Sequence, residues 1–294
     1  MKVENIKTVA VLGAGTMGNG IAQVVAGAGY NVVMRSRNKA TVDSGLERIK
    51  GSLKKFVERE KISQKDSDQL LSRITITTDL AAAVKDADLI IETIAEDMKL
   101  KKEFFKEIAG LCKKEAILTS NTSTLSITEI ASATDRPDKV VGTHFFNPVP
   151  LMGAVEIIKG VLTSDDTVEL VVKVAGKLGK TPIVVKDSPG FASTRLGVAL
   201  FLEAMKMFEE GVASVKDLDQ GAKLFYGHRM GPFETCDIVG LDARLNNLIS
   251  MYQATGDPKW APPLLLKQLV AAGYIGKKPG SKGGFYAYFG LENA

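Results

Sequence analysis

The sequence contains little cysteine and little histidine, and it has no long apolar run. Cys112 and Cys236 are its two cysteines, and neither stands in a Cys-x-x-Cys or Cys/His spacing. Such sparse cysteine excludes a disulfide framework and gives no sign of a zinc site, so we expect no bound metal and a reducing cytoplasm. The first residues lack the pattern of a secretion signal, and no apolar stretch of about eighteen residues follows, so we expect neither a secreted nor a membrane protein.

An excess of charge of one sign is also missing. The chain has 38 Lys and Arg residues against 34 Asp and Glu residues, a net charge of +4. This mild basicity is far from the dense Lys/Arg surface of a nucleic-acid-binding protein, and it is compatible with an anionic small ligand. With 45% hydrophobic and 24% charged residues, the composition is that of a folded protein. A length of 294 residues exceeds one ordinary core and predicts two domains.

The first part of the chain does contain many short apolar runs, which alternate with helical patterns. The runs are "TVAVLG", "NVVMR", "ITITT", "ADLIIET", "AILTSNTS", "VVGTHFFN", "VEIIKG" and "TPIVVKD". Their high Val and Ile content predicts the strands of a mostly parallel sheet that helices cover on both faces. After "KDSPG" the strand signals stop and the pattern becomes helical. We therefore predict an α/β domain over residues 1–187 and a smaller all-α domain over residues 188–294.

A glycine-rich turn near the N-terminus indicates a nucleotide site. In "VAVLGAGTMGNG", Gly13, Gly15 and Gly18 form Gly-x-Gly-x-x-Gly between an apolar run and a helical pattern. The first glycine permits a tight turn, the second lets the backbone approach a pyrophosphate, and the third lets helix and strand pack closely. Backbone N–H groups at the helix start, around Thr16 and Met17, then bind phosphate. Glycine turns occur in many folds for conformational reasons alone, but this context favours a dinucleotide.

The residues after the second predicted strand bear on the choice of dinucleotide. An acidic residue usually stands there and binds the ribose 2′-hydroxyl of NAD. This chain has Ser36 between Arg35 and Arg37, a set that accepts a 2′-phosphate and can bind it with charge-assisted hydrogen bonds. We therefore favour NADP over NAD. The alternative is that both arginines point into solvent and NAD binds through the glycines.

The best candidate for a general base is one of the two histidines. His144 stands at the end of a predicted strand in "VGTHFFNPVP", where open α/β sheets bind ligands. Glu156 follows in the apolar segment "AVEIIKG", where a lone carboxylate needs a partner. A carboxylate on one ring nitrogen fixes the tautomer of histidine and stabilises its protonated form, as proton transfer from an alcohol requires. Spacing alone leaves a structural role for His144 equally open, and for His228 in "YGHRMGP" we favour the structural role.

Longer motifs carry a resemblance to a known family. "VAVLGAGTMGNGIAQ", "SNTSTLSITEIASAT", "HFFNPVP", "VEIIKG", "SPGF", "MGPFETCDIVGLD" and "GFYAY" occur in that order over almost the whole chain. They resemble the L-3-hydroxyacyl-CoA dehydrogenase family, and especially its short 3-hydroxybutyryl-CoA type. The resemblance implies a Rossmann domain followed by a helical dimerisation domain. It also implies NAD(P)-dependent interconversion of (S)-3-hydroxyacyl-CoA and 3-ketoacyl-CoA, with an acyl-CoA substrate and a homodimer.

The resemblance also assigns roles to single residues. It makes His144 the base, Glu156 its orienting partner, and Ser123 of "SNTS" a hydroxyl that contacts both substrate and cofactor. The other residues that we expect at the cofactor are Glu96, Lys101, Asn121, Asn147 and Lys278.

The chain departs from the family pattern at three positions. The family usually has Asn in "GF-x-x-N-R", where it polarises the C3 oxygen of the substrate, whereas "GFASTR" has Thr194. The threonine hydroxyl can still donate one hydrogen bond, so we expect activity. Which acyl chain the protein prefers stays open. Gly153 replaces a common Lys, and Ser36 replaces the usual Asp, which we interpret as a change of cofactor preference.

A predicted helix over residues 46–61 presents an apolar stripe and a basic face. The apolar stripe consists of Leu46, Ile49, Leu53, Phe56 and Val57. The basic face consists of Arg48, Ser52, Lys55 and Arg59. Periodicity alone favours a solvated charge face. The resemblance instead implies that Ser52 and Arg59, with Lys55 between them, contact the nucleotide of coenzyme A.

Together these observations predict a short-chain 3-hydroxyacyl-CoA dehydrogenase. Two alternatives stay open at this point. One is a related dehydrogenase of a free hydroxy acid or sugar acid, which would not need the basic face. The other is a catalytically silent nucleotide-binding protein, against which the combination of His144, Glu156 and Ser123 argues.

Overall fold

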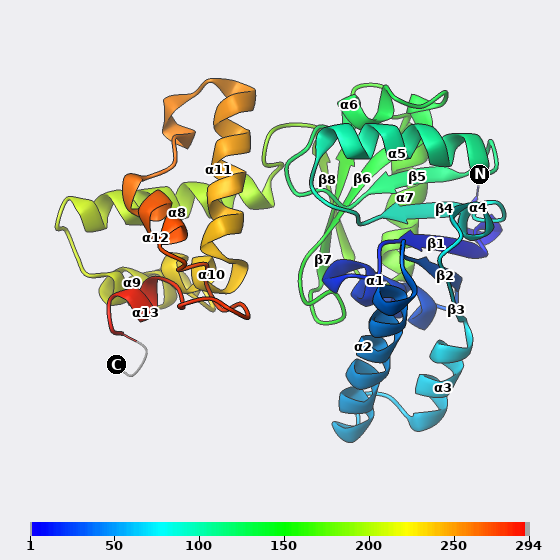
Figure 1. Ribbon diagram of the computed structural model, residues 1–294, viewed down its shortest axis with the longest axis horizontal. Coiled ribbons are helices and arrows are strands. Elements are labelled where there is room, and N and C mark those ends of the chain that lie inside the picture. The colour runs from blue at the N-terminus through cyan, green and yellow to red at the C-terminus, as the bar shows by residue number, and fades with distance from the viewer. Residues whose placement is uncertain (1, 292–294) are drawn as a thin grey trace. The chain divides into compact units, whose positions relative to one another are not determined.

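The computed structural model describes residues 2–291 and consists of two compact units, divided between Ser188 and Pro189 (Figure 1). Within residues 2–291, none of the helices has the length and apolar character that crossing a bilayer requires.

One eight-stranded sheet forms the centre of the first unit. Its strands, in chain order, are β1 (Thr8–Leu12), β2 (Asn31–Arg35), β3 (Ile74–Thr77), β4 (Leu89–Glu92), β5 (Ile117–Ser120), β6 (Val140–Phe145), β7 (Ala154–Lys159) and β8 (Thr181–Lys186). They correspond to the eight predicted runs, so the predicted mostly parallel α/β fold is confirmed. In space the order is β3-β2-β1-β4-β5-β6-β7-β8. Neighbours pair in parallel except β6 and β7, whose antiparallel pairing reverses the last two strands.

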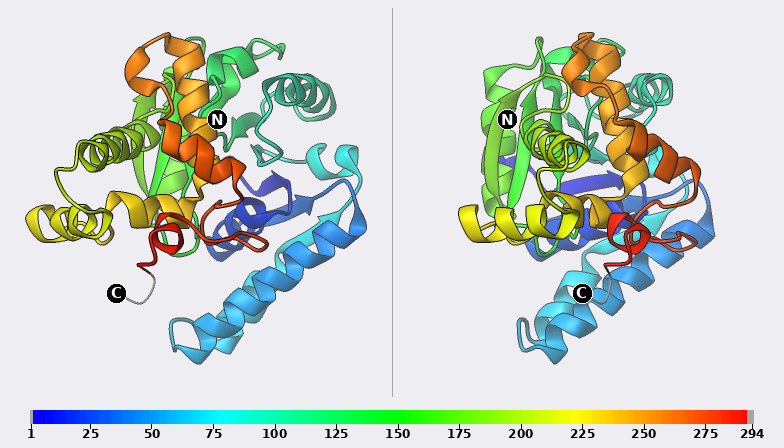
Figure 2. Two further views of the ribbon diagram at one scale, coloured as in Figure 1. Left: turned by 60° about the vertical axis from the view of Figure 1, so that its left-hand side comes forward. Right: turned by 90° about the vertical axis from the view of Figure 1, so that its left-hand side faces the viewer.

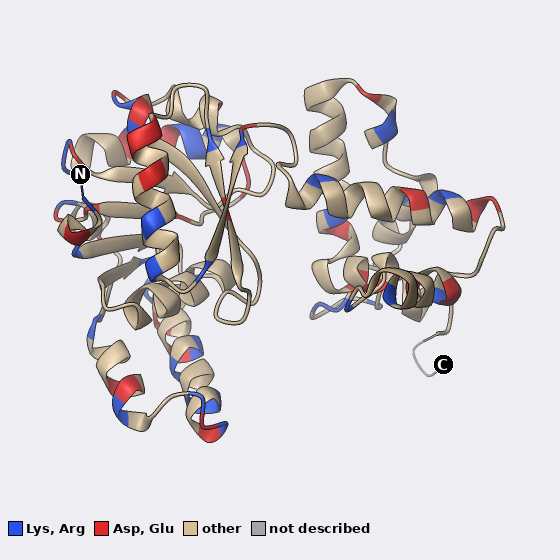
Figure 3. Cartoon of the chain, turned by 180° about the vertical axis from the view of Figure 1, so that it is seen from behind, with Lys and Arg blue, Asp and Glu red and all other residues tan. Residues whose placement is uncertain are grey.

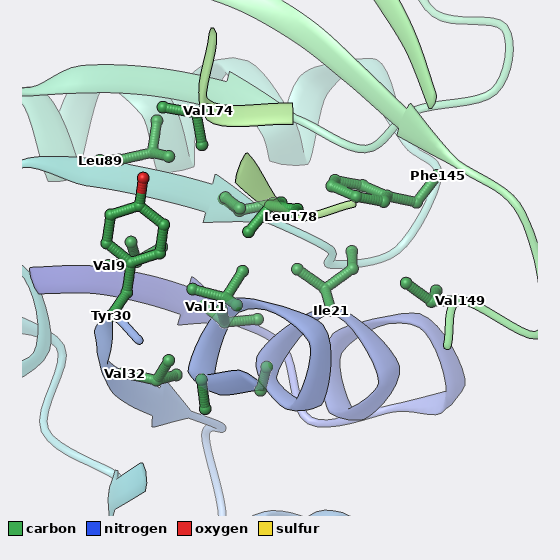
Figure 4. Packing of buried hydrophobic residues seen from close by; sticks show 14 of the residues in the cluster. Val9, Val11, Ile21, Tyr30, Val32, Leu89, Phe145, Val149, Val174 and Leu178 are labelled. Atoms are coloured by element: carbon green, nitrogen blue, oxygen red, sulfur yellow. The ribbon is translucent and has the colours of Figure 1, made fainter. Parts of the chain in front are cut away.

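Helices cover both faces of this sheet. They are α1 (Thr16–Gly27), α2 (Lys39–Glu58), α3 (Gln64–Ser72), α4 (Leu80–Val84), α5 (Met98–Leu111), α6 (Ile127–Ala131) and α7 (Asp165–Lys177), with short 3-10 turns at Val3–Asn5 and Pro137–Lys139. Strand side chains alternate between the two faces. Val9 and Val11 accordingly pack with Ile21 of α1 and Val174 of α7 in one core cluster (Figure 4). Helices α5 and α6 lie on the opposite side of the sheet from α1 (Figure 1).

Helices α2 and α3 lie side by side and extend away from the sheet (Figure 2). Asn38 caps the start of α2, since its side chain accepts a hydrogen bond from the Thr41 N–H. Ile49 and Leu53 are buried on the inner side of α2. The helix therefore begins earlier than the sequence pattern predicted and ends at Glu58, so that Arg59 is its C-cap and lies outside it.

The second unit is helical. Its elements are α8 (Ser193–Glu209), α9 (Val215–Tyr226), α10 (Pro232–Val239), α11 (Leu241–Thr255), the 3-10 turn Pro258–Trp260, α12 (Leu264–Ala271) and α13 (Phe285–Tyr288). Phe201, Phe233 and Phe285 form the middle of its core, with ring centroids 5.2–6.0 Å apart. The long segment from residue 272 to residue 284 is not helical, although the sequence pattern predicted helix there.

Two buried carboxylates cap helices in this unit. Asp219 accepts hydrogen bonds from the N–H groups of Phe233 and Glu234, at the start of α10. Asp237 accepts from the N–H groups of Phe285 and Tyr286, at the start of α13. Burial raises the pKa of both carboxyl groups, and these hydrogen bonds offset it only in part.

Charged residues of both signs are mixed on the helices of both units (Figure 3). Helix α7 has Asp165 and Asp166 in its first turn and Lys177 in its last, the order that the helix dipole favours.

Candidate active site

Five loops meet at one edge of the sheet. They follow β1, β2, β4, β5 and β6, whose carboxyl ends point the same way because these strands pair in parallel. The chain winds outward from β1 in both directions, since β2 lies on one side of it and β4 on the other. In open α/β sheets, ligands bind in the crevice at such a reversal. The predicted site residues of the first unit lie in these loops, or beside them on β2, β6, β7, α1, α2 and α5.

The glycine-rich turn joins β1 to α1 by close contacts. Gly13 has φ +121°, which L side chains rarely adopt, and a Cβ there would lie 2.3 Å from the Thr93 hydroxyl oxygen. A Cβ at Gly18 would lie 1.8 Å from the carbonyl oxygen of Gly13. The fold itself therefore requires glycine at these two positions.

Gly15 differs from the other two glycines. A Cβ there would meet no described protein atom within 4 Å, and its backbone is in an ordinary extended conformation. Gly15 is also the N-cap of α1, and no side chain of the described residues caps that helix start. Thr16 and Met17 are the first two residues of α1, and their backbone N–H groups have no partner within the helix. The open space and the uncapped helix start fit the pyrophosphate of a dinucleotide.

A hollow of about 200 Å³ lies beside this turn, and Gly13, Gly15, Arg35, Ser36 and Arg37 are among its lining residues. Ser36 is the first residue beyond β2. The Arg35 Nε donates to the carbonyl oxygen of Thr78 at 3.2 Å, and burial lowers the pKa of this guanidinium. Arg37 is exposed.

His144 and Glu156 form a buried pair. They are directly opposite each other in the antiparallel pairing of β6 and β7, so their side chains project from the same face of the sheet. The His144 Nδ1 lies 2.8 Å from the Glu156 Oε2. The histidine side chain keeps 9% exposure and the carboxylate 1%. This contact favours the tautomer in which Nδ1 carries a proton toward the carboxylate.

A second buried network extends from the end of β4. Glu92, with no exposed side-chain surface, accepts hydrogen bonds from the Lys101 Nζ, the Ile94 N–H and the Ser120 hydroxyl, each at 2.6 Å. Glu92 was not predicted from the sequence, although a carboxylate at the end of the apolar run "LIIE" indicates a buried charge that needs a partner. Lys101, predicted at the cofactor, is 1% exposed and is paired with Glu92.

Glu96 extends this network to the loop after β5. Its Oε2 lies 3.6 Å from the Lys101 Nζ. Its Oε1 accepts from the Ser123 N–H at 2.9 Å and from the Thr122 hydroxyl at 2.5 Å. The structure thus brings together three predicted residues, Glu96, Lys101 and Ser123. The carboxylate holds the backbone of Ser123, and the serine side chain is half-buried.

The two predicted asparagines differ in their surroundings. The side-chain oxygen of Asn121 accepts from the Phe145 N–H at 2.9 Å, so Asn121 fixes the strand end next to His144. Asn147 is exposed and precedes Pro148 across a cis peptide bond.

The basic face of α2 borders another hollow, of about 440 Å³. Its lining residues include Arg48, Ser52, Lys55 and Arg59 from the helix side and Pro148, Pro150 and Leu151 from the loop after β6. Of the predicted apolar stripe, Ile49 and Leu53 are fully buried, whereas Phe56 is half-buried and lines this hollow.

The remaining predicted residues lie elsewhere. Thr194 is in the first turn of α8 and Lys278 is in the loop before α13, both in the second unit. The Lys278 Nζ pairs with the Asp242 carboxylate. Gly153 has open space around its Cβ position, so nothing in the structure explains why glycine stands there.

Comparison with known proteins identifies the family. The family model for the NAD binding domain of 3-hydroxyacyl-CoA dehydrogenase matches residues 8–188, and the model for the C-terminal domain matches residues 190–288. The chain is 43% identical over 279 residues to 3-hydroxybutyryl-CoA dehydrogenase of Clostridioides difficile, covering 95% of this chain and 98% of the relative. It is 43% identical over 283 residues to the probable 3-hydroxybutyryl-CoA dehydrogenase of Bacillus subtilis, covering 96% and 98%.

A solved structure agrees with this. The (S)-3-hydroxybutyryl-CoA dehydrogenase of Ralstonia eutropha matches with a TM-score of 0.90 and 42% identity, over 94% of this chain and 98% of that one. The chain therefore belongs to the 3-hydroxyacyl-CoA dehydrogenase family.

Proposed function

We propose that the protein interconverts (S)-3-hydroxyacyl-CoA and 3-ketoacyl-CoA with a nicotinamide cofactor, and that it acts on short acyl chains. The observation that carries this proposal is the buried contact between His144 and Glu156 at the loop edge that also bears the glycine turn. The names of the relatives from C. difficile and R. eutropha support the short chain.

The residues of the chain divide the work as follows. The Nε2 of His144 takes the proton of the C3 hydroxyl during oxidation and returns it during reduction. Glu156 holds the ring in the required tautomer and stabilises the imidazolium that forms. The hydroxyl of Ser123, whose backbone Glu96 anchors, donates to the C3 oxygen. A bound nicotinamide supplies the acceptor or donor of hydride at C3.

The direct test uses His144→Ala. We expect turnover of acetoacetyl-CoA to fall at least about 100-fold, because general acid–base catalysis is lost. Cofactor affinity, measured by fluorescence titration, should stay within about twofold, since the glycine turn is intact. His228→Ala is the matched control and should keep full activity. Retained turnover in His144→Ala would contradict the proposal.

We further propose that the enzyme prefers NADP(H). Arg35, Ser36 and Arg37 line the hollow beside the glycine turn. Because Ser36 stands where an acidic residue is usual, no carboxylate at this position repels a 2′-phosphate. Of the two arginines, Arg37 is the better candidate, because the Arg35 side chain already bonds to Thr78. We expect Arg37→Ala to raise KM for NADPH about tenfold while KM for NADH changes less than about twofold. A wild-type kcat/KM that favours NADH would refute the preference.

The basic face of α2 is our proposed contact for the nucleotide of coenzyme A. Arg59→Ala should raise KM for acyl-CoA about tenfold with little change in kcat, since the contact lies away from the reacting carbon. Lys54→Ala, on α2 but outside the hollow, should change neither value. An unchanged KM for Arg59→Ala would leave this face as a solvated surface and would favour a free hydroxy acid as substrate.

We also propose a homodimer in the cytoplasm. In the second unit Leu224, Phe225 and Tyr226 are 71–78% exposed at the end of α9, and contiguous exposed apolar residues mark association surfaces. Both cysteines are free, in keeping with a reducing compartment. Sedimentation equilibrium of the wild type should give twice the chain mass, and a monomer at micromolar concentration would contradict the dimer.

A further inference from the structure

The loop between β6 and β7 is a wall shared by two hollows. Pro148 and Pro150, with Leu151, line the hollow of the basic face on α2. Pro148, Val149 and Pro150, with Asn147, also line a hollow whose other side includes Thr16 and Gly20 of the cofactor helix α1. The same loop joins the strand of His144 to the strand of Glu156. Its position therefore bears on the hollow of the basic face and on the hollow beside α1.

The loop contacts α1 closely. A Cβ at Gly20 would lie 3.0 Å from the Val149 Cβ, so helix and loop touch with no space between them. Val149 is buried and belongs to the same core cluster as Ile21 of α1 (Figure 4). A movement of this loop would therefore displace atoms of α1 and would change the shape of the hollow beside α2.

Lys180 ties this loop to the rest of the unit. Its Nζ donates to the carbonyl oxygen of Val149 at 2.7 Å and to that of Met152 at 2.6 Å. The residue is 8% exposed, and among the described residues no carboxylate forms an ion pair with its Nζ. Burial accordingly lowers the pKa of this ammonium.

A buried ammonium is costly, and hydrogen bonds to two backbone carbonyl oxygens offset part of that cost. What the ammonium does provide is a bridge between two carbonyl groups three residues apart. It complements the turn in which the Leu151 and Met152 N–H groups both donate to the Pro148 carbonyl oxygen, at 2.9 and 3.1 Å.

We propose that Lys180 is a positioning residue for acyl-CoA. It holds in place the loop 147–152, which lines both the hollow beside α1 and the hollow of the basic face on α2. It does so through the carbonyl groups of Val149 and Met152 and touches neither substrate nor the reacting atoms. This inference rests on the proposed function.

The test compares Lys180→Met with Lys177→Met, an exposed lysine at the end of the neighbouring helix α7. In Lys180→Met we expect KM for acetoacetyl-CoA to rise about tenfold while kcat falls less than about threefold. Hydrogen exchange at the Leu151 and Met152 amides should speed up at least about tenfold, because the turn loses its bridge. Lys177→Met should change none of these. Lys180→Gln, which keeps one donor, should give intermediate values and serves if Lys180→Met does not fold.

Two results would overturn the inference. One is a lowered melting temperature with unchanged KM and kcat, which is the behaviour of a purely structural residue. The other is unchanged exchange at Leu151 and Met152, which would mean that Lys180 does not hold the loop. The wild-type assay separates these from a failure of the proposed function: if the wild type does not turn over acyl-CoA, the exchange rates and calorimetric titration with free coenzyme A still decide the role of Lys180.

Discussion

At the scale of single residues, loss of a charge buried at the end of β4 should change the free energy of unfolding more than loss of a charge on the surface. Glu92 and Lys101 are 0% and 1% exposed, and Glu92 accepts three hydrogen bonds. Breaking a buried ion pair leaves the remaining charge poorly compensated, here with only the exposed Glu96 at 3.6 Å from the Lys101 Nζ, whereas an exposed pair contributes little. The pair therefore matters chiefly through what happens when one member is lost.

Glu92→Gln should accordingly lower the free energy of unfolding by about 3 to 5 kcal/mol, measured by urea denaturation. The double variant Glu92→Gln with Lys101→Met removes both charges and should recover more than half of that loss. Glu129→Gln, which breaks the exposed pair with Lys102, is the control and should cost less than about 1 kcal/mol. Equal losses in the single and double variants would show that the ion pair itself is not the cause.

Glu156 acts on catalysis through His144. Glu156→Gln keeps the shape of the side chain but removes the charge that stabilises the imidazolium, so kcat should fall about 100-fold with KM for acyl-CoA nearly unchanged. Steady-state kinetics of the folded variant measures this. The exposed Glu169→Gln is the control. A fall in KM and kcat by the same factor would point to altered substrate binding instead.

At the scale of elements, two glycines of one turn serve different purposes. Gly18 is required by the packing of α1 on β1, since a Cβ there would overlap the Gly13 carbonyl oxygen. Gly15 has room for a side chain and an ordinary backbone conformation. Space at Gly15 therefore matters for a ligand, while space at Gly18 matters for the fold.

This difference predicts opposite phenotypes. Gly18→Ala should destabilise the first unit by about 1 to 3 kcal/mol through overpacking. Gly15→Ala should leave the melting temperature of the cofactor-free protein within about 1 °C of wild type, and it should weaken dinucleotide binding at least about tenfold, because the methyl group occupies the path of the pyrophosphate. Thermal melts and cofactor titration of the two variants give the answer. Cofactor binding unchanged in Gly15→Ala would contradict the assignment of this turn.

The elements also show what the sequence could predict. All eight strands carried a local signal, because a buried strand needs a continuous run of apolar, mostly β-branched residues. The direction of β7 had no such signal, because an apolar run such as "VEIIK" is compatible with a parallel and with an antiparallel strand. The opposition of His144 and Glu156 depends on that direction, so spacing left the pair open. Lys180 was missed for a related reason, because its carbonyl partners lie about thirty residues away in the chain.

At the scale of the whole molecule, buried carboxylates give the two units opposite responses to acid. In the first unit, burial alone would raise the pKa of Asp88, but hydrogen bonds from Lys113 and from the N–H groups of Lys7 and Thr8 outweigh it, and the pKa lies below its ordinary value. Stability from Asp88 is thus present above about pH 4 and is lost as the pH falls through the lowered pKa. In the second unit, burial raises the pKa of Asp219 and Asp237. Their contribution therefore grows as the pH falls from neutral toward about 4.

We therefore predict that acid unfolds the first unit before the second. The single tryptophan, Trp260, is 4% exposed in the core of the second unit and reports on that unit alone. Its fluorescence change should come at a lower pH than the first loss of far-UV circular dichroism. Asp88→Asn should reduce the pH dependence of the first loss of circular dichroism, and it should leave the pH of the tryptophan fluorescence change unaltered. Coincident transitions, or a tryptophan change that comes first, would contradict this.

The antiparallel meeting of β6 and β7 has one more consequence. Strand side chains alternate between faces, so a shift of pairing by a single residue would send Glu156 to the far side of the sheet and leave His144 opposite an isoleucine or a valine. A molecule folded with that slip would keep nearly the same content of helix and strand and would look native to bulk spectroscopy. It would be inert. Specific activity per folded molecule is therefore a direct count of correctly assembled chains, and it can be used to follow refolding where spectra cannot tell native from misaligned protein.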